Sequence, residues 1–348
     1  MDLYIYNSQL EHIGIVDVFQ SLIWVRRYSA AGTFELYLAD NAADCIGRGN
    51  YIYRPDCGEI MYISAAETTQ DRHIIVTGYS AEGILRKRAL REDVKGGVNA
   101  VLSRVLAAAP IPMLELSAEN DIVGNYDGDA AASLEDYVRF MIGDSGLSYR
   151  IDFERERGKL IFKIYGGMDR STDVIFAETL GNMYNVRYSA AEDGCYNVIV
   201  CTCTVPDDDV EIYGGLPRYT YNDNIVGLER NELRLIVDPV IKLGLRVVDE
   251  KVIEYKYVDN GDTLKIMQAQ AAAMASNVSE NFTADVMAGG YRTEYNVGDM
   301  VSVINSIGGA VYVRRVEEVK EVIDTAGRTV TPVFGDNLKT IYDLIKMR

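Results

Sequence analysis

The chain has 348 residues, more than one hydrophobic core normally organises, so its length predicts two or three domains. Hydrophobic residues make up 48% of the sequence and charged residues 25%, values typical of folded globular proteins and not of disordered, collagen-like or coiled-coil chains. The 52 acidic residues outnumber 35 lysines and arginines, giving a net charge of −17, which disfavours a protein that binds nucleic acid by neutralising its phosphates.

The N-terminal sequence has no basic region followed by an apolar stretch, and no apolar run approaches the ~20 residues that a membrane span requires. We therefore expect neither a targeting signal nor an integral membrane segment. The cysteines form an odd set without paired zinc-type spacing, namely Cys45, Cys57, Cys195, Cys201 and Cys203. Such a set fits synthesis in a reducing compartment, so we expect production in the cytoplasm.

Alternating hydrophobicity predicts six short strands in residues 1–95. In the segment 33–38, Phe34, Leu36 and Leu38 fall on one face and the residues between them on the other, the pattern of a half-buried strand. Similar runs, separated by turn residues, occupy 4–6, 22–28, 51–54, 60–64 and 73–77. Six strands at this spacing predict an antiparallel barrel or sandwich.

Residues 96–170 change to a helical period. Apolar residues recur at helical spacing from Val98 to just before Pro110, which cannot sit inside a helix. A second amphipathic helix begins after its N-cap Ser133 and stops at Gly143 or Gly146. Two strands follow, at 148–153 and 160–165. This part reads as a small α/β unit inserted between β-rich parts.

Strand patterns return from residue 171 onward. They occupy 196–204, 233–237, 300–304 and 311–320. A long helix capped at Asp262 is predicted for 262–279, and a short final helix for 338–345. We therefore predict a mainly β protein with α+β parts, with two barrel-like antiparallel β units and an inserted small α/β domain. Its domains are 1–95 (β-barrel-like), 96–170 (inserted α/β) and 171–348 (β-rich, and able to share strands with the other units).

One segment resembles the nucleophile segment of trypsin-like proteases, because residues 143–146 read Gly-Asp-Ser-Gly. A nucleophilic Ser145 would need a histidine base held by a carboxylate. The only histidines, His12 and His73, lie outside the segment in which such proteases place theirs, and the motif directly follows a predicted helix. We interpret it as a helix stop.

Metal and cofactor sites have no support in the sequence. Cys195, Cys201 and Cys203 cluster but are one ligand short of a closed zinc site, with no histidine near. The 125–129 segment lacks the twelve-residue calcium frame, the aspartates at 207–209 are typical of a solvated loop, and no glycine-rich phosphate-binding motif occurs. We therefore predict no enzyme activity and no catalytic, cofactor-binding or metal-binding residue.

Short motifs of glycines, aromatics and strand residues recur in a fixed order along the chain. The N-terminal ones are Ser21, Trp24, Tyr28, Gly32, Phe34-Glu35-Leu36, a strand at 50–54, Gly78, Ser80 and the basic stretch 85–88. The later ones are Tyr165-Gly166-Gly167-Met168-Asp169-Arg170-Ser171, Gly181-Asn182, Tyr295-Asn296-Val297-Gly298-Asp299-Met300-Val301 and Pro332-x-Phe334-Gly335. In this order they resemble the ReqiPepy-type tail hub (tail-tip) family of siphophages and prophages of Gram-positive bacteria.

The resemblance implies a structural role. A hub of this kind is a homotrimer in the virion tail, made in the bacterial host cytoplasm, with barrel-like domains that form a pseudo-sixfold ring between the tail tube and the host-attachment apparatus. Its partners are the distal tail protein, the tail tube and the tape measure. The excess of acidic residues suits a lumen that repels passing DNA.

The resemblance also assigns structural roles to individual residues. Gly32, Gly78 and Gly298 would serve turns between strands, and Trp24, Phe34 and Leu36 would be core. No catalytic residue is implied.

Two alternatives belong to other classes. Some tail-tip proteins are fused to peptidoglycan-cleaving or glycan-binding domains, so the chain could be a tail-associated peptidoglycan hydrolase or a glycan-binding host-recognition module. The hub pattern occupies nearly all 348 residues, however, which leaves no room for an appended hydrolase of usual domain size. The other alternative is an unrelated soluble β-rich enzyme. Only the absence of a recognisable set of catalytic residues in the sequence counts against it.

Overall fold

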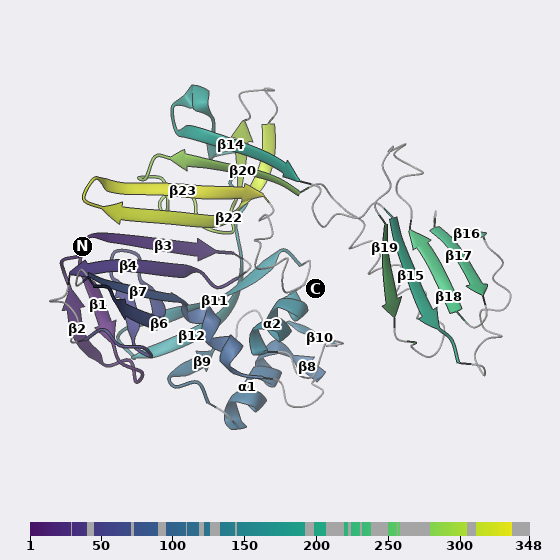
Figure 1. The fold of residues 1–348 in the computed structure, drawn as a ribbon, viewed down its shortest axis with the longest axis horizontal. Coiled ribbons are helices and arrows are strands. Elements are labelled where there is room, and N and C mark those ends of the chain that lie inside the picture. The colour runs from purple at the N-terminus through teal and green to yellow at the C-terminus, as the bar shows by residue number, and fades with distance from the viewer. Residues whose placement is uncertain are drawn as a thin grey trace. The chain divides into compact units, whose positions relative to one another are not determined.

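The fold is that of a computed structural model of the chain (Figure 1). It describes residues 1–28, 30–39, 45–70, 73–89, 95–108, 110–117, 122–125, 133–142, 145–191, 198–206, 219–221, 224–229, 232–237, 250–255, 257, 279–304 and 311–335. The chain divides into two compact units. The first comprises Met1–Tyr188 with Asn281–Asn337, and the second comprises Ser189–Glu280 with Leu338–Arg348.

The first unit is built on a thirteen-stranded sheet (Figure 1). Its path runs β14-β20-β23-β22-β3-β4-β7-β6-β5-β1-β2, with β21 beside β22 and β13 beside β21. The N-terminal strands are β1 (Leu3–Tyr6), β2 (His12–Val16), β3 (Ser21–Arg27), β4 (Thr33–Ala39), β5 (Tyr51–Arg54), β6 (Glu59–Thr68) and β7 (His73–Ser80). The later ones are β13 (Ile175–Phe176), β14 (Met183–Ala191), β20 (Ser279–Val286), β21 (Met300–Ile304), β22 (Val311–Asp324) and β23 (Gly327–Gly335).

Period-two patterning explains the N-terminal strands, and all six predicted there are present. In β7 each buried side chain is followed by a half-buried one, and β4 places Phe34, Leu36 and Leu38 in the core. Trp24 is 0% exposed and its ring lies 5.8 Å from that of Phe34. The mainly β fold predicted from the sequence is confirmed, as is the burial of Trp24, Phe34 and Leu36.

Strand β22 joins two halves of the sheet that have separate hydrophobic cores. Its first residues pair with β21, and its segment from Glu318 to Asp324 pairs with β3 on one side and β23 on the other. A bulge between Val316 and Glu318 puts Val316 on the same buried face as Val319 and Glu321. The N-terminal strands and the later strands β13, β14 and β20 to β23 therefore belong to one continuous hydrogen-bonded sheet.

The sequence analysis predicted two barrel-like units. In the described residues the sheet path has two ends, β14 and β2, and does not close into a barrel. Strands β1 and β2 run at a large angle to β22 and β23, so the sheet is strongly curved (Figure 1).

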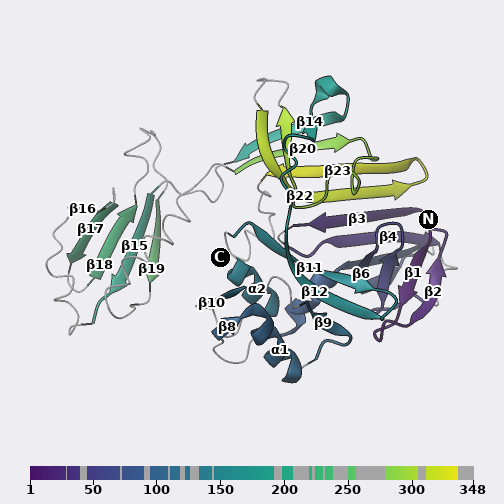
Figure 2. The same ribbon diagram turned by 180° about the vertical axis from the view of Figure 1, so that it is seen from behind.

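The segment 81–166 contains both predicted helices and two small sheets (Figure 2). Its elements are η2 (Ala81–Lys87), β8 (Lys95–Gly97), α1 (Val98–Ala108), β9 (Leu114–Leu116), β10 (Val123–Asn125), α2 (Leu134–Ile142), β11 (Leu147–Glu154) and β12 (Lys159–Gly166). Ser133 caps α2 as expected: its hydroxyl accepts the Asp136 backbone N–H at 3.2 Å, while the Asp136 carboxylate accepts the Ser133 N–H at 3.1 Å. After β12 the chain reaches the short helix η3 (Glu178–Leu180).

The second unit contains a five-stranded sheet in the order β16-β17-β18-β15-β19. Its strands are β15 (Val198–Thr204), β16 (Tyr219–Tyr221), β17 (Asn224–Glu229), β18 (Glu232–Val237) and β19 (Glu250–Tyr255). The helices predicted for 262–279 and 338–345 lie outside the described residues, except for Ser279, which begins β20. No helix in the described part of the chain is long and apolar enough to span a membrane.

One predicted glycine role is wrong. Gly32 directly precedes β4, and Gly298 has a φ of +98° just before β21, so both serve connections between strands. Gly78 instead lies inside β7, opposite Ile63 of β6. A side chain there would place Cβ 1.9 Å from the Tyr62 carbonyl oxygen and 2.5 Å from the Phe34 ring. Close approach of two backbones, and not a turn, requires glycine at this position.

We expect Gly78→Ala to lower the free energy of unfolding by about 1–3 kcal/mol, because the added methyl group meets paired backbone that cannot move aside. Urea unfolding followed by the fluorescence of Trp24, the only tryptophan, measures this change. Gly289→Ala is the matched control, since nothing lies within 4 Å of the Cβ it would add. Equal losses in the two variants would contradict the close-approach explanation.

Candidate functional site

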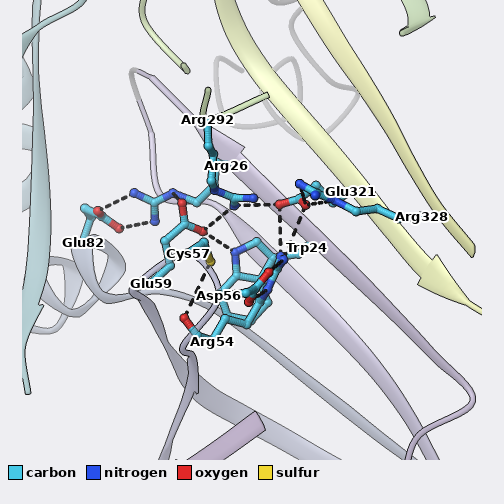
Figure 3. Close-up of polar contacts among 10 residues, drawn as sticks. All are labelled: Trp24, Arg26, Arg54, Asp56, Cys57, Glu59, Glu82, Arg292, Glu321 and Arg328. Atoms are coloured by element: carbon cyan, nitrogen blue, oxygen red, sulfur yellow. Dashed lines mark hydrogen bonds and ion pairs between the residues drawn. The ribbon is translucent and has the colours of Figure 1, made fainter. Parts of the chain in front are cut away.

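A cluster of buried ion pairs occupies the seam where β22 meets the N-terminal strands (Figure 3). We call it the seam network. It contains four arginines and four carboxylates around one indole. They come from β3, β5, the β5–β6 turn, β6, η2, the turn after β20, β22 and β23: Arg26, Arg54, Arg292, Arg328, Asp56, Glu59, Glu82, Glu321 and Trp24. The formal charges balance, as buried ionic groups require.

The carboxylate of Glu321 is the centre of the network and is fully buried. It accepts from Arg54 Nη1 at 3.0 Å, Arg292 Nη2 at 2.6 Å and Arg328 Nη2 at 2.6 Å. Burial would raise the pKa of Glu321, but the hydrogen bond from Arg292 and the charges of Arg54 and Arg292 lower it to about 2. The carboxyl group is therefore ionised throughout the physiological range.

Glu59 connects this centre to the core tryptophan. Its Oε2 accepts from Trp24 Nε1 at 2.6 Å and from Arg292 Nη2 at 3.1 Å. The Arg54 guanidinium carbon lies 5.2 Å from the centroid of the Trp24 ring, within cation–π range. Trp24 thus combines apolar burial with a satisfied indole N–H, which a buried tryptophan requires.

Glu82 links strand β11 to the network. It accepts from Arg26 Nη2 at 3.1 Å and from the backbone N–H of Ile151 in β11 at 3.0 Å. Burial would raise the pKa of Glu82, but the charge of Arg26 and these hydrogen bonds lower it. Three stretches of chain that are distant in sequence are therefore fixed to each other by charged groups.

Two of the glycine-containing family motifs, at 165–171 and 295–301, meet beside the network. Asp299 accepts from the Met168 N–H at 2.8 Å, the Asn296 N–H at 2.9 Å and Arg170 Nε at 3.2 Å. At Gly167 a Cβ would lie 1.8 Å from the Gly298 oxygen, so only glycine allows the two segments to touch. The motifs at 165–171 and 295–301 therefore form one structural joint.

A pocket of about 250 Å³ opens between this joint and the seam network. Its charged lining residues are Arg26, Glu59, Arg150, Arg170 and Asp299, and its aromatic ones are Tyr165 and Tyr291. Two of the three guanidiniums have carboxylate partners just outside the lining, Glu82 beside Arg26 and Asp152 beside Arg150. The sequence analysis did not find this pocket, because its residues come from segments as far apart as Arg26 and Asp299 and share no spacing.

The segments considered as chemical sites do not come together in the described residues. Ser145 follows α2, with its N–H bonded to the Ile142 oxygen at 3.1 Å, and Gly146 has a φ of +74°, as a helix stop requires. His12 packs between Tyr4 and Tyr6, and His73 lies 3.1 Å from Gln20 Nε2, so neither histidine bonds to Ser145.

The structure describes only some of the candidate metal ligands. Cys201 and Cys203 are buried in β15, whereas Cys195, residues 126–129 and the aspartates at 207–209 lie outside the described residues. Within the described residues, no group of three or more His, Cys, Asp or Glu side chains could hold a metal ion.

Comparison with known proteins gives one family match and several fold matches. A family model described as Siphovirus ReqiPepy6 Gp37-like protein matches residues 2–215 and 245–336. The tail protein from Neisseria meningitidis MC58 has a TM-score of 0.62 at 15% identity, with 96% of each chain covered. The 43 kDa tail protein of prophage MuSo2 from Shewanella oneidensis has a TM-score of 0.63 at 12% identity, covering 96% of this chain and 98% of that one.

Prophage tail protein gp18 from Listeria monocytogenes EGD-e has a TM-score of 0.57 at 13% identity, covering 99% of this chain and 98% of that one. No curated protein sequence matches the chain. At 12–15% identity these solved structures show a shared fold, and the family model shows the sequence relationship.

We expect stability to fall as the pH drops from about 4.5 toward 2. The pKa of Glu321 is about 2 in the folded protein and 4.5 ordinarily, so its contribution is complete above pH 4.5 and is lost as the pH falls through 2. The difference corresponds to about 3 kcal/mol. Glu321→Gln removes this part of the pH dependence, and at pH 7 costs about 3–5 kcal/mol because it leaves buried guanidiniums unpaired.

Urea unfolding at several pH values, followed by Trp24 fluorescence, checks both effects. Glu154→Gln is the control, because Glu154 is 41% exposed and its pair with Arg157 lies on the surface, where such pairs contribute less than about 1 kcal/mol. An unchanged pH profile in Glu321→Gln would disprove the assignment.

Proposed function

Because the chain belongs to the Siphovirus ReqiPepy6 Gp37-like family, we propose that it is a structural component of a phage tail tip or baseplate hub. The order of short motifs along the sequence indicated this family, and the family model confirms that resemblance. The observation that carries the proposal is the shared fold with three phage or bacterial tail proteins over at least 96% of both chains. The protein would act in the virion tail, as a ring between the tail tube and the host-attachment apparatus.

The two ends of the large sheet support assembly into a ring. In the described residues β2 and β14 each pair with one neighbour only, so each presents backbone groups that another strand can bind. Beside these edges lie the exposed side chains of Ile13 and Ile15 on β2 and of Tyr184 and Tyr188 on β14. Because the two edges differ, contact between them is head-to-tail, the arrangement that generates closed rings.

The seam network favours a structural role for the chain and not a catalytic one. Its carboxylates are all engaged by guanidiniums, which makes them stabilising groups and leaves none poised as an acid or base. In the proposed hub, the segments 1–95 and 171–348 supply two β-rich surfaces per chain and the segment 96–170 is an insert. Three copies would then present six similar surfaces to the tail tube, with the distal tail and tape-measure proteins as further partners.

We expect the purified chain to be a monomer or a weak trimer that shifts toward trimer at moderate salt, and to form a stable threefold ring when co-expressed with its distal tail protein. A net charge of −17 makes protomers repel, and physiological salt screens this repulsion over about 8 Å. Light scattering coupled to size exclusion, followed by negative-stain imaging, measures both states.

A strand-edge variant tests the same assembly. Ile15→Lys should weaken the ring, since a lysine on an edge strand opposes pairing, and Met113→Lys, exposed but outside the large sheet, should not. A stable dimer under all conditions, with no ring on co-expression with the distal tail protein, would count decisively against the hub proposal.

The alternative of a peptidoglycan hydrolase leads to an opposite expectation. We expect the purified protein to leave the turbidity of a Gram-positive sacculus suspension unchanged, because Ser145 has no histidine partner in the described residues. Dose-dependent clearing that Ser145→Ala abolishes would establish the hydrolase instead.

A further inference from the structure

The pocket beside the seam network has an unequal supply of hydrogen-bond donors and acceptors. Its two carboxylates are already engaged: Asp299 accepts two backbone N–H groups and Arg170 Nε, and Glu59 accepts Trp24 Nε1 and Arg292 Nη2. Little acceptor capacity is therefore left for a ligand.

Its donors are in surplus. Arg150 stacks on Tyr165 at 4.8 Å and its Nε lies 3.2 Å from Asp152 Oδ1, but its Nη groups donate to no oxygen in the described residues. Arg170 is bound to Asp299 through Nε, and its Nη2 contacts only the Met168 sulfur, at 3.5 Å. Both arginines are about one-third or more exposed, so their free ends can reach a ligand.

Two tyrosines add neutral donors to the same pocket. Tyr291 is 4% exposed and lines the pocket, and its hydroxyl has no hydrogen-bond partner within the described residues. Burial and the charge of Glu59 raise the pKa of Tyr291 well above its usual value, so the hydroxyl keeps its proton. Tyr165 lines the pocket beside Arg150, and its hydroxyl is likewise unpaired in the part of the chain that the structure describes.

From this surplus of donors we infer that the pocket binds a carboxylate, namely the side chain of an aspartate or glutamate presented by a partner tail protein. The donors left over are guanidinium nitrogens of Arg150 and Arg170 and two hydroxyl groups, and guanidinium groups bind the two oxygens of a carboxylate in a planar, charge-assisted geometry. A volume of about 250 Å³ is below the ~300–1,000 Å³ of typical small-molecule sites and suits one side chain. That the partner is a tail protein rests on the proposed function.

The test is a titration of the isolated chain, labelled with ¹⁵N-arginine, with an acetylated and amidated tripeptide that has a central glutamate. The Nε–H signals of Arg150 and Arg170, identified by substitution, should shift saturably with this peptide and not with its glutamine counterpart. Arg170→Gln should weaken binding about tenfold or more, because hydrogen bonds to charged groups are the strong ones. Tyr291→Phe should weaken it several-fold.

Two controls separate binding from folding and from general charge. Arg157→Gln removes an exposed arginine from the β11–β12 turn and should leave the affinity unchanged, while Trp24 emission reports that each variant is folded. Equal binding of the glutamine peptide, tighter binding of inorganic phosphate, or no saturable shift with any probe would overturn the inference. Ring formation without peptide binding would refute this inference alone, and peptide binding without a ring would refute the hub alone.

Discussion

The carboxylate of Glu321 can remain buried only while guanidinium groups from three other places in the fold surround it. Arg54 comes from β5, Arg292 from the turn after β20 and Arg328 from β23, and all reach the same two oxygens. Because an unpaired buried charge is far costlier than a paired one, these contacts must form together or not at all. The seam between the two halves of the large sheet is thereby given one geometry.

The same seam explains how a long curved sheet keeps two cores in register. Strand β22 belongs to the hydrophobic core of the C-terminal half through Val316 and Val319, and pairs with β3, whose Trp24 belongs to the core of the N-terminal half. Glu59 joins the indole to Arg292. Movement of one half against the other would break apolar packing and ion pairs at once.

Charge is distributed unevenly over the protein. The chain carries a net charge of −17, yet the pocket beside the seam is lined by three arginines and has hydrogen-bond donors without partners in the described residues. In an acidic protein such a place attracts anions against the general field, so it can select where an acidic partner binds.

The sequence by itself determined the elements. Alternation fixed β4 and β7, helical spacing fixed α1 and α2, and Ser133 capped α2, because these features depend on neighbours along the chain. The strand predicted for 311–320 ends before Glu321, whereas β22 continues to Asp324, so the sequence analysis did not find this buried charge.

Only the tertiary structure decided what the elements build. Arg54 and Glu321 are 267 residues apart, and Gly78 is glycine because of the Tyr62 backbone, so no local pattern encodes either contact. The pocket follows from the same cause, since Arg150, Arg170 and Tyr291 lie on separate segments. Pairing across the sheet brings them together, and the resulting distances decide which donors are satisfied and which remain free.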